Sequence, residues 1–289
     1  MIADLIKLAR PQQYTKNLFI FIPAFFAFQL TEAGLVLDAI IAFISFSLLA
    51  SAVYVFNDWI DRREDAQHPE KCHRPIASGR IRAPAAFGFL VLLLLVGGSL
   101  AYALSLEVFS LVLAYLVLNL AYTLKLKHIA IIDIVIIATG FVIRLFVGAE
   151  ATQVELSHWI IVMTFLLALF LSLAKRRDDV LIYLNTDQKM RKVIDGYNLK
   201  FLDSAMMMTA SITIVAYILW SISAEVAERL NTEYLYLSSV FVVLGILRYM
   251  QIALVEEKSG NPSKVLLRDR FIQLTLVGWG GVFIWVLYL

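Results

Sequence analysis

The chain has 289 residues, of which 61% are hydrophobic and 17% charged, and its formal net charge is +2. A mean hydropathy of +0.79 is too high for an ordinary soluble domain, so the composition favours a polytopic membrane protein, and we expect no nucleic-acid partner. The single cysteine, Cys72, excludes an intrachain disulfide framework. The first residues lack a cleavable signal pattern, so the first apolar helix should be retained.

Apolar runs of membrane-spanning length recur along the whole sequence. They predict an all-α fold with nine transmembrane helices in a single domain, residues 1–289. The first run is short for a span unless the residues before it contribute. The expected spans are 18–30, 35–56, 85–106, 108–124, 129–148, 158–174, 203–222, 234–254 and 271–289.

The distribution of Lys and Arg indicates the orientation. With the N-terminus inside, 22 of the 25 basic residues fall in inside segments, while the outside connections contain only Arg229. We therefore expect a protein of the plasma (inner) membrane with a cytoplasmic N-terminus and cytoplasmic active-site loops. The outside connections are short, so the function should reside in the membrane and in those loops. Two loops, 57–84 and 175–202, are distinguished by their length and charge.

Carboxylates cluster where the second expected span ends, in Asn57-Asp58-x-x-Asp61-x-x-x-Asp65. Helical spacing places Asn57, Asp61 and Asp65 on one stripe, with Asp58 beside Asp61. Carboxylates at the mouth of a membrane helix need a counter-charge. Hard oxygen ligands of this kind suit Mg²⁺, with Mn²⁺ as an alternative. We predict that these four residues hold a metal ion against a diphosphate.

Cations follow these carboxylates in the same loop, at Lys71 and Arg74, after His68. Lys and Arg would neutralise the phosphate oxygens that the metal does not cover. Pro75 and Gly79 interrupt the helix and would let the loop fold over a site. The alternative is a solvated loop with scattered ion pairs, which gives no reason for carboxylates in helical register.

The second loop begins with Lys175-Arg176-Arg177-Asp178-Asp179. A positive-inside anchor would explain one basic triplet. The adjacent Asp pair and the corresponding position after the sixth span favour a functional motif. Lys175 and Asp179 are four residues apart and should share a helical face.

Three further regions hold candidates that the sequence leaves open. The segment from Arg10 to Asn17, which includes Lys16, is equally well explained as an interfacial anchor. Tyr122 and Lys125 end the fourth span in the same manner. Arg144 lies deep in the fifth span, and a structural ion pair and a cavity-facing role are equally consistent with it.

The motif Asn57-Asp58-x-x-Asp61-x-x-x-Asp65, the nine expected spans and the second charged loop resemble the UbiA-type prenyltransferase superfamily over essentially the whole chain. The opening Arg10-Pro11-x-Gln13-Tyr14-x-Lys16-Asn17 resembles the decaprenyl-phosphate phosphoribosyltransferase branch. Lys175-Arg176-x-x-Asp179 is similar to the Lys-Arg-x-x-Glu of that branch, with Asp in place of Glu. The segment from Asn261 to Asp269 resembles it too, and the second aspartate-rich repeat usual in aromatic prenyltransferases is missing.

This resemblance implies a helical bundle around a central cavity that opens to the cytoplasmic side. It also implies an Mg-dependent transfer of 5-phosphoribosyl from 5-phosphoribosyl 1-diphosphate to a polyprenyl phosphate, with release of diphosphate, in the synthesis of cell wall precursors. The implied catalytic residues are Asp58, Asp61, Lys175, Arg176 and Asp179. The implied substrate- and diphosphate-binding residues are Lys16, Asn57, Lys71, Arg74, Tyr122 and Lys125. Lys16, Lys175 and Arg176 would neutralise donor or lipid phosphates, and Asp179 would contact a ribose hydroxyl or orient Lys175.

Rival functions share some of these features. An aromatic or haem-type prenyltransferase with a prenyl diphosphate donor has the same first motif and fold, but the second motif argues against it. A transporter would place its polar groups near the bilayer midplane, whereas most charges here lie at one face. A non-catalytic scaffold gives no reason for the carboxylate stripe. Prenyl chain length and oligomeric state, a homo-oligomer included, stay open.

Overall fold

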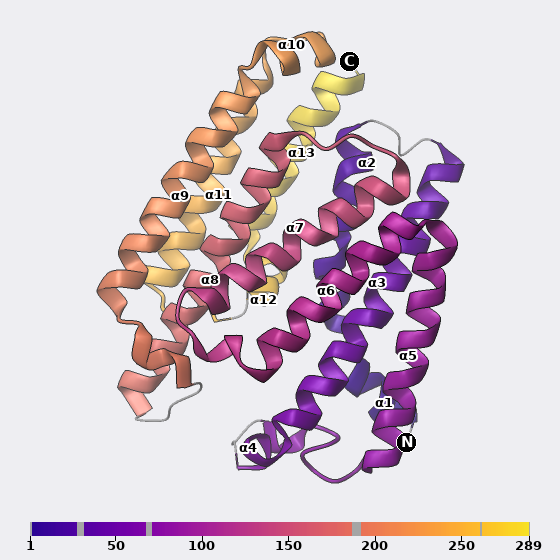
Figure 1. Ribbon diagram of the computed structural model, residues 1–289. Helices are drawn as coiled ribbons and strands as arrows, with labels where there is room; N and C mark the ends of the chain where they lie inside the picture. Colours follow the sequence, from indigo (N-terminus) through magenta and orange to yellow (C-terminus); the bar gives the residue numbers. More distant parts are fainter. Residues whose placement is uncertain (1, 28–31, 68–70, 187–191, 261, 289) are drawn as a thin grey trace. The chain divides into compact units, whose positions relative to one another are not determined.

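The computed structural model describes residues 2–27, 32–67, 71–186, 192–260 and 262–288, and every regular element in these ranges is a helix (Figure 1). Seven of the helices in this part of the chain are long and apolar enough to cross a membrane. A helix satisfies its backbone polar groups internally, which hydrocarbon requires. The all-α prediction is confirmed, whereas the count of nine spans and the central cavity stay predictions.

The chain forms two compact units, residues 1–127 with 139–156, and residues 128–138 with 157–289. The boundary passes through α7 (Ile132–Thr152), which contributes its first turns to unit 2 and the rest to unit 1. The other elements of unit 1 are α1 (Ile2–Ala9), η1 (Pro11–Phe21), α2 (Ile22–Phe26), α3 (Ala33–Ile60), α4 (Arg62–Ala66), η2 (Lys71–His73), α5 (Ala83–Leu104) and α6 (Leu106–Leu124), with η3 (Leu126–His128) at its edge. The prediction of a single domain is not tested by this division.

In unit 1, α3 is the central helix, and α1, η1, α5 and α6 all pack against it. Small residues allow the close approach of α5. A Cβ on Gly97 would lie 2.7 Å from Cγ of Leu49, and the Ser45 hydroxyl donates to the Gly97 carbonyl at 2.7 Å. Such contacts are typical of membrane helices, whose association depends on close packing and interhelical hydrogen bonds.

The first predicted span, 18–30, differs from the structure. The described residues there form the 3₁₀ helix η1 and the short α2, with Pro11 at the start of η1 and Pro23 within α2. On α7, Gly148 makes room for this segment, because a Cβ there would lie 2.0 Å from the carbonyl oxygen of Ile20. Close backbone packing thus accompanies a conformation that hydropathy alone does not reveal.

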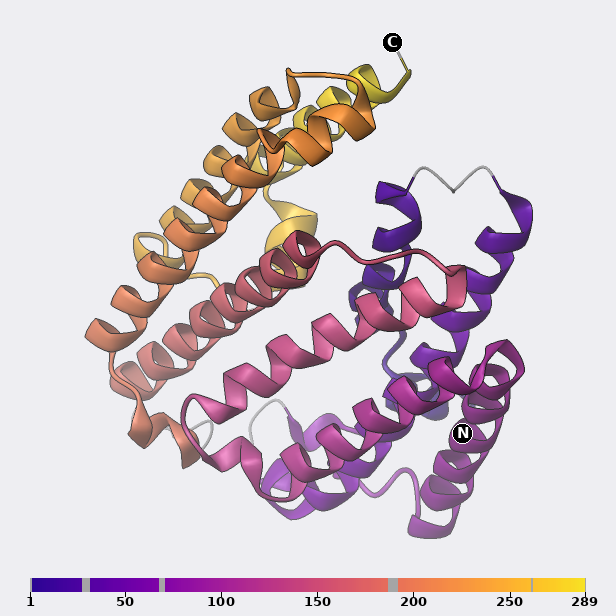
Figure 2. The same ribbon diagram turned by 45° about the horizontal axis from the view of Figure 1, so that its top comes forward.

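Unit 2 is built on four long helices: α8 (His158–Thr186), α9 (Leu199–Ser221), α11 (Ser239–Leu254) and α13 (Arg270–Tyr288). Figures 1 and 2 both show α9 beside α11, and α11 also contacts α8 and α13. The short elements of this unit are η4 (Lys192–Gly196), α10 (Ala224–Leu230), η5 (Leu235–Ser238) and α12 (Pro262–Arg268). The buried core includes Phe170, Leu173, Leu202, Met206 and Ile246.

The two predicted loops begin inside helices. Helix α3 continues to Ile60 and α8 to Thr186, so the first residues of both charged motifs are helical. The second connection ends where the Asn198 side chain accepts a hydrogen bond from the Phe201 N–H at 2.8 Å and caps α9. His68 and Asn261 lie outside the described residues.

Candidate active site

The first motif spans the junction of α3 and α4. The Asp61 N–H donates to the Asn57 carbonyl at 2.9 Å, and the Asp65 N–H donates to the Asp61 carbonyl at 2.8 Å. These i to i−4 bonds carry the helical register through the junction, although α3 ends at Ile60. Asn57, Asp61 and Asp65 therefore follow one another in helical register, as their spacing predicted.

Two of the motif's carboxylates are buried and share one cation. Nη1 of Arg74 lies 3.0 Å from Oδ1 of Asp58 and 2.6 Å from Oδ2 of Asp65. Only 2% of the Asp58 side chain and 5% of the Asp65 side chain are exposed. Charges so far from water need a partner, and Arg74 meets this need by joining the loop to the end of α3.

A second cation on Asp58 comes from Arg10, whose Nη2 donates to the same Oδ1. Arg10 precedes η1 with a φ of 54°, a left-handed conformation uncommon outside glycine. Its guanidinium lies 5.0 Å from the centre of the Tyr54 ring. Arg10 was not among the predicted site residues. Arg10 appeared only in the N-terminal sequence pattern. Neither sequence spacing nor hydropathy predicts that it contacts Asp58, which lies 48 positions away.

Asp61 is bound by a lysine that the sequence did not single out. Nζ of Lys127 lies 2.6 Å from Oδ1 of Asp61. The predicted neighbours of Lys127 differ: Lys125, at the end of α6, is exposed, whereas Tyr122 is half-buried. Lys16, Asn57 and Lys71 are also half-buried. One feature of the sequence could have identified Lys127: it lies in the same short connection as the predicted site residue Lys125.

The donors of the first motif fit a hard divalent cation in kind, since they are three carboxylates and an amide. In the arrangement described, however, Arg10, Arg74 and Lys127 neutralise Asp58, Asp61 and Asp65. Within the described ranges no three His, Cys, Asp or Glu side chains are grouped closely enough to hold a metal ion. The magnesium set Asn57, Asp58, Asp61 and Asp65 thus stays a prediction.

The second motif lies on α8 in unit 2 and centres on Arg176. Its side chain is only 1% exposed; Nε lies 2.6 Å from Oδ2 of Asp133, and Nη1 contacts Oδ2 of Asp179. Asp133, in the first turn of α7, is fully buried and also accepts a hydrogen bond from the Tyr197 hydroxyl at 2.6 Å. The structure therefore surrounds Arg176 with carboxylates of its own chain.

The neighbouring residues of this motif hold other parts of unit 2. Nε of Arg177 lies 2.7 Å from Oδ1 of Asp203 on α9, and Nη1 donates to the Ala253 carbonyl on α11 at 2.6 Å. Asp178 abuts Gly260, where an added Cβ would lie 2.0 Å from Oδ2. Lys175 is half-buried. Arg177 thus joins three helices, a structural task rather than that of a simple headgroup anchor.

Comparison with known proteins decides the family. The model of the UbiA prenyltransferase family matches residues 19–275. The chain belongs to the UbiA prenyltransferase family. It is 29% identical to a decaprenyl-phosphate phosphoribosyltransferase of Mycolicibacterium smegmatis, over 97% of this chain and 91% of that protein. It is also 29% identical to the protein of the same name from Corynebacterium glutamicum, over 99% of this chain and 87% of that protein.

The fold of this UbiA family member agrees with a solved structure. A UbiA homologue from Archaeoglobus fulgidus, bound to DMAPP and Mg²⁺, superposes with a TM-score of 0.72. The match covers 98% of this chain and 100% of that chain at 19% identity. The resemblance predicted from the sequence is confirmed at the level of the family. The roles of the individual site residues are not tested by these comparisons.

Arg144 of this UbiA family member has neutral partners among the described residues. Its guanidinium donates to Oδ1 of Asn17 at 2.8 Å and to the Gly140 carbonyl at 2.7 Å. The guanidinium carbon lies about 5 Å from the ring centres of Phe46, Tyr115 and Phe141. The structure thus offers a third explanation, a buried cation stabilised by amide, carbonyl and aromatic groups, instead of the ion pair considered from the sequence.

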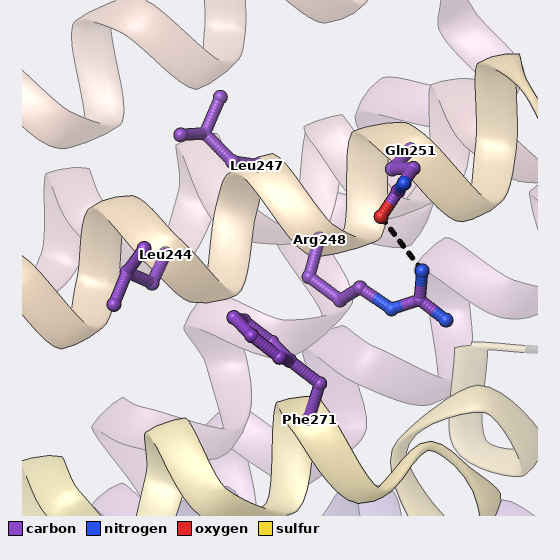
Figure 3. A pocket seen from close by; sticks show the side chains of 5 residues that line it. All are labelled: Leu244, Leu247, Arg248, Gln251 and Phe271. Atoms are coloured by element: carbon purple, nitrogen blue, oxygen red, sulfur yellow. Dashed lines mark hydrogen bonds between the residues drawn. The ribbon is translucent and has the colours of Figure 1, made fainter.

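A pocket of about 360 Å³ lies on α11 and α13, and none of its lining residues belongs to either motif (Figure 3). Leu244, Leu247, Arg248, Gln251 and Phe271 line it. Arg248 is already bound by Asp269 at 2.7 Å and by Glu256 at 2.7 Å. With its cation neutralised by two carboxylates, this pocket has no feature that would recognise a diphosphate, and we assign it no part in the site.

Proposed function

We propose that this UbiA family member transfers a 5-phosphoribosyl group from 5-phosphoribosyl 1-diphosphate to a polyprenyl phosphate of the decaprenyl-phosphate type, with release of diphosphate. The observation that carries the proposal is the nearly full-length similarity to two decaprenyl-phosphate phosphoribosyltransferases. The activity that their name states also agrees with a second motif that is basic, Lys175-Arg176, rather than a second aspartate-rich repeat.

The carboxylates of the first motif give the donor its metal site. Asn57, Asp58, Asp61 and Asp65 would hold Mg²⁺, or Mn²⁺ as the alternative. When bound, the metal supplies stabilisation of the charge that develops on the leaving diphosphate. The solved homologue bound to DMAPP and Mg²⁺ supports a divalent metal beside a diphosphate in this fold.

Basic residues neutralise the phosphate charge that the metal does not cover. Lys71 and Arg74 neutralise diphosphate oxygens in unit 1, and Lys16 and Lys175 neutralise donor or lipid phosphates. Tyr122 and Lys125 are weaker candidates for the same task. The donor carries a further phosphate on C5 of the ribose, which needs a cation of its own, and Lys175 of the second motif meets this need.

The reaction needs no strong general base, because the acceptor phosphate is already an anionic nucleophile. One of its oxygens forms a bond to C1 of the ribose while the bond from C1 to the diphosphate oxygen breaks, through an oxocarbenium-like state. The bonding electrons leave with the diphosphate, where nearby positive charge stabilises them. The prenyl chain of the acceptor lies in the bilayer, and the motifs face the cytoplasm in agreement with the charge distribution.

The second candidate is a prenyltransferase that uses a prenyl diphosphate and an aromatic or haem-type acceptor. The observation in its favour is the fold match to a homologue bound to DMAPP. It would share the metal site of the first motif. It leaves the basic second motif without a task, which is why we rank it below phosphoribosyl transfer.

A transfer assay tests the proposal. The purified protein in detergent is incubated with Mg²⁺, a polyprenyl phosphate and labelled 5-phosphoribosyl 1-diphosphate, and label in the organic phase is measured. We expect a labelled lipid that disappears on chelation and in Asp61→Asn. Glu64→Gln, an exposed carboxylate of α4 outside the predicted metal set, is the matched control and should keep its activity. Turnover of a prenyl diphosphate instead would favour the second candidate.

A further inference from the structure

A chain of buried polar contacts runs through unit 2, and sequence spacing alone does not reveal it. Asp133 accepts from Nε of Arg176 on one carboxylate oxygen and from the Tyr197 hydroxyl on the other, each at 2.6 Å. Arg176 in turn contacts Asp179 through Nη1. The contacts therefore run from the segment before α9, through the first turn of α7, to the second motif on α8.

Exposure increases from Asp133 through Arg176 to Asp179. The side chain of Asp133 is 0% exposed, that of Arg176 is 1% exposed, and that of Asp179 is 13% exposed. A guanidinium that is buried and bound to two carboxylates cannot turn to a substrate phosphate without leaving both charges unpaired. Of the three, Asp179 is the group best placed to meet a ligand from solvent.

Tyr197 supports this arrangement from a strained turn. Its hydroxyl accepts a hydrogen bond from the Ile131 N–H at 2.7 Å while it donates to Asp133. Ile131 has a φ of 71°, which is a costly conformation for a β-branched residue. The turn is also tightly packed, since a Cβ on Gly196 would lie 2.6 Å from Cβ of Ala130. Strain of this kind persists where the surrounding contacts over-determine it, often at functional sites.

We propose that Asp133 and Tyr197 are positioning residues, which hold Arg176 and, through it, orient Asp179 for the transfer reaction. This inference rests on the proposed function. It gives Arg176 a different task from direct phosphate neutralisation: its guanidinium fixes the carboxylate of Asp179 on the helix. Groups that support a reacting residue in this way keep it within the narrow range of productive geometries.

The protonation state of Tyr197 agrees with this task. Burial, and next the hydrogen bond to Asp133, raise the pKa of the Tyr197 hydroxyl above its ordinary value. The hydroxyl therefore stays protonated across the physiological range and remains a donor to Asp133.

A double-mutant cycle tests the proposal in the full-length protein. Tyr197→Phe should lower kcat about tenfold, because even a small misplacement of a group at the reaction centre costs up to about 100-fold in rate. In an Asp179→Asn background the same change should have less than about a twofold further effect, because coupled residues are not additive. Losses that multiply in the double variant would overturn the proposal.

The chain offers a matched control in Tyr217 of α9. It is 7% exposed, as against 8% for Tyr197, and its hydroxyl also takes part in two hydrogen bonds at 2.7 Å, one with the Ser238 hydroxyl and one donated by Nε1 of Trp279. Tyr217→Phe should lower the melting temperature about as much as Tyr197→Phe and leave kcat unchanged. Equal kcat in both variants would mean that Tyr197 is merely structural.

A separate readout distinguishes failure of this inference from failure of the proposed function. If the wild-type protein transfers no phosphoribosyl group, the proposed function fails, and the cycle is run on the prenyl transfer that the protein then catalyses. Melting temperatures of Asp133→Asn, Tyr197→Phe and their double variant report the contact chain without any substrate. Additive shifts in melting temperature would contradict the coupling on which the inference depends.

Discussion

Lys127 binds Asp61 across 66 positions of sequence, with Nζ 2.6 Å from Oδ1. The short η3 segment after α6 thereby returns a cation to the end of α3. Since 13% of the lysine side chain and 22% of the aspartate side chain are exposed, the pair is largely shielded from water. The pair fixes the orientation of the central carboxylate of the first motif.

Replacement of this lysine should impair catalysis. We expect Lys127→Met to lower kcat about 10- to 100-fold, because Asp61 is a proposed metal ligand and the loss of a group that orients such a ligand typically has this effect. The transfer assay at saturating Mg²⁺ measures it. Lys7→Met, on the exposed face of α1, is the control and should behave as the wild type. Unchanged turnover in Lys127→Met would contradict a role of the pair in catalysis.

Arg144 should matter for stability even with its charge retained. Arg144→Lys keeps the positive charge but cannot reach Asn17, Gly140 and the aromatic rings at once, since lysine lacks the planar fork. Groups left unpaired in the interior cost about 1–3 kcal/mol each. Thermal unfolding in detergent should show a clear decrease in melting temperature, whereas Arg229→Lys, at an exposed position of α10, should show none. Equal melting temperatures would argue against the environment described for Arg144.

Gly148 should tolerate no side chain. In Gly148→Ala the new Cβ would lie 2.0 Å from the Ile20 carbonyl oxygen, so η1 would have to move away from α7. Overpacking of this kind destabilises by about 1–3 kcal/mol or more. Gly88→Ala is the matched control, because a Cβ at this helical glycine of α5 meets nothing within 4 Å. Gly88→Ala should keep or slightly raise the melting temperature. If Gly148→Ala were as stable as the wild type, the close contact between Gly148 and Ile20 would be disproved.

The ion pair between Arg248 and Asp269 should make stability depend on acid pH. The hydrogen bond from Arg248 holds the pKa of Asp269 below its usual value. Such a group stabilises the fold above its pKa in the unfolded chain, about 3.9, and this contribution is lost as the pH falls through the folded value. Asp269→Asn should therefore lower the melting temperature at pH 7, and the difference from the wild type should shrink below about pH 4.

The asparagine variant isolates the ion pair. Oδ1 of Asp269 also accepts a hydrogen bond from the Ile272 N–H at 2.9 Å at the start of α13, and an asparagine carbonyl can replace it. A difference in melting temperature that stayed constant from pH 7 to pH 3 would show that the pair contributes nothing through charge.

Local and periodic features of the fold were accessible from sequence. Long apolar runs predicted the helices. Apart from a closed β-barrel, only a helix pairs all of its backbone polar groups internally, as the hydrocarbon of a membrane requires. The spacing of Asn57, Asp61 and Asp65 predicted their common register, and backbone hydrogen bonds preserve it through the junction after Ile60. The 3₁₀ conformation of η1 was not accessible, and neither was its close contact with Gly148, which lies far along the chain.

By itself, the sequence determined the class of fold, the family and the positions of both charged motifs, because these depend on hydropathy, helical period and residues close together in the chain. Only the tertiary structure decided which charges meet. Arg10 reaches Asp58, Lys127 reaches Asp61 and Arg176 reaches Asp133, across 48, 66 and 43 positions respectively. A buried charge takes whichever partner the packing of helices brings within hydrogen-bonding distance, and spacing along one helix carries no information about a partner on another.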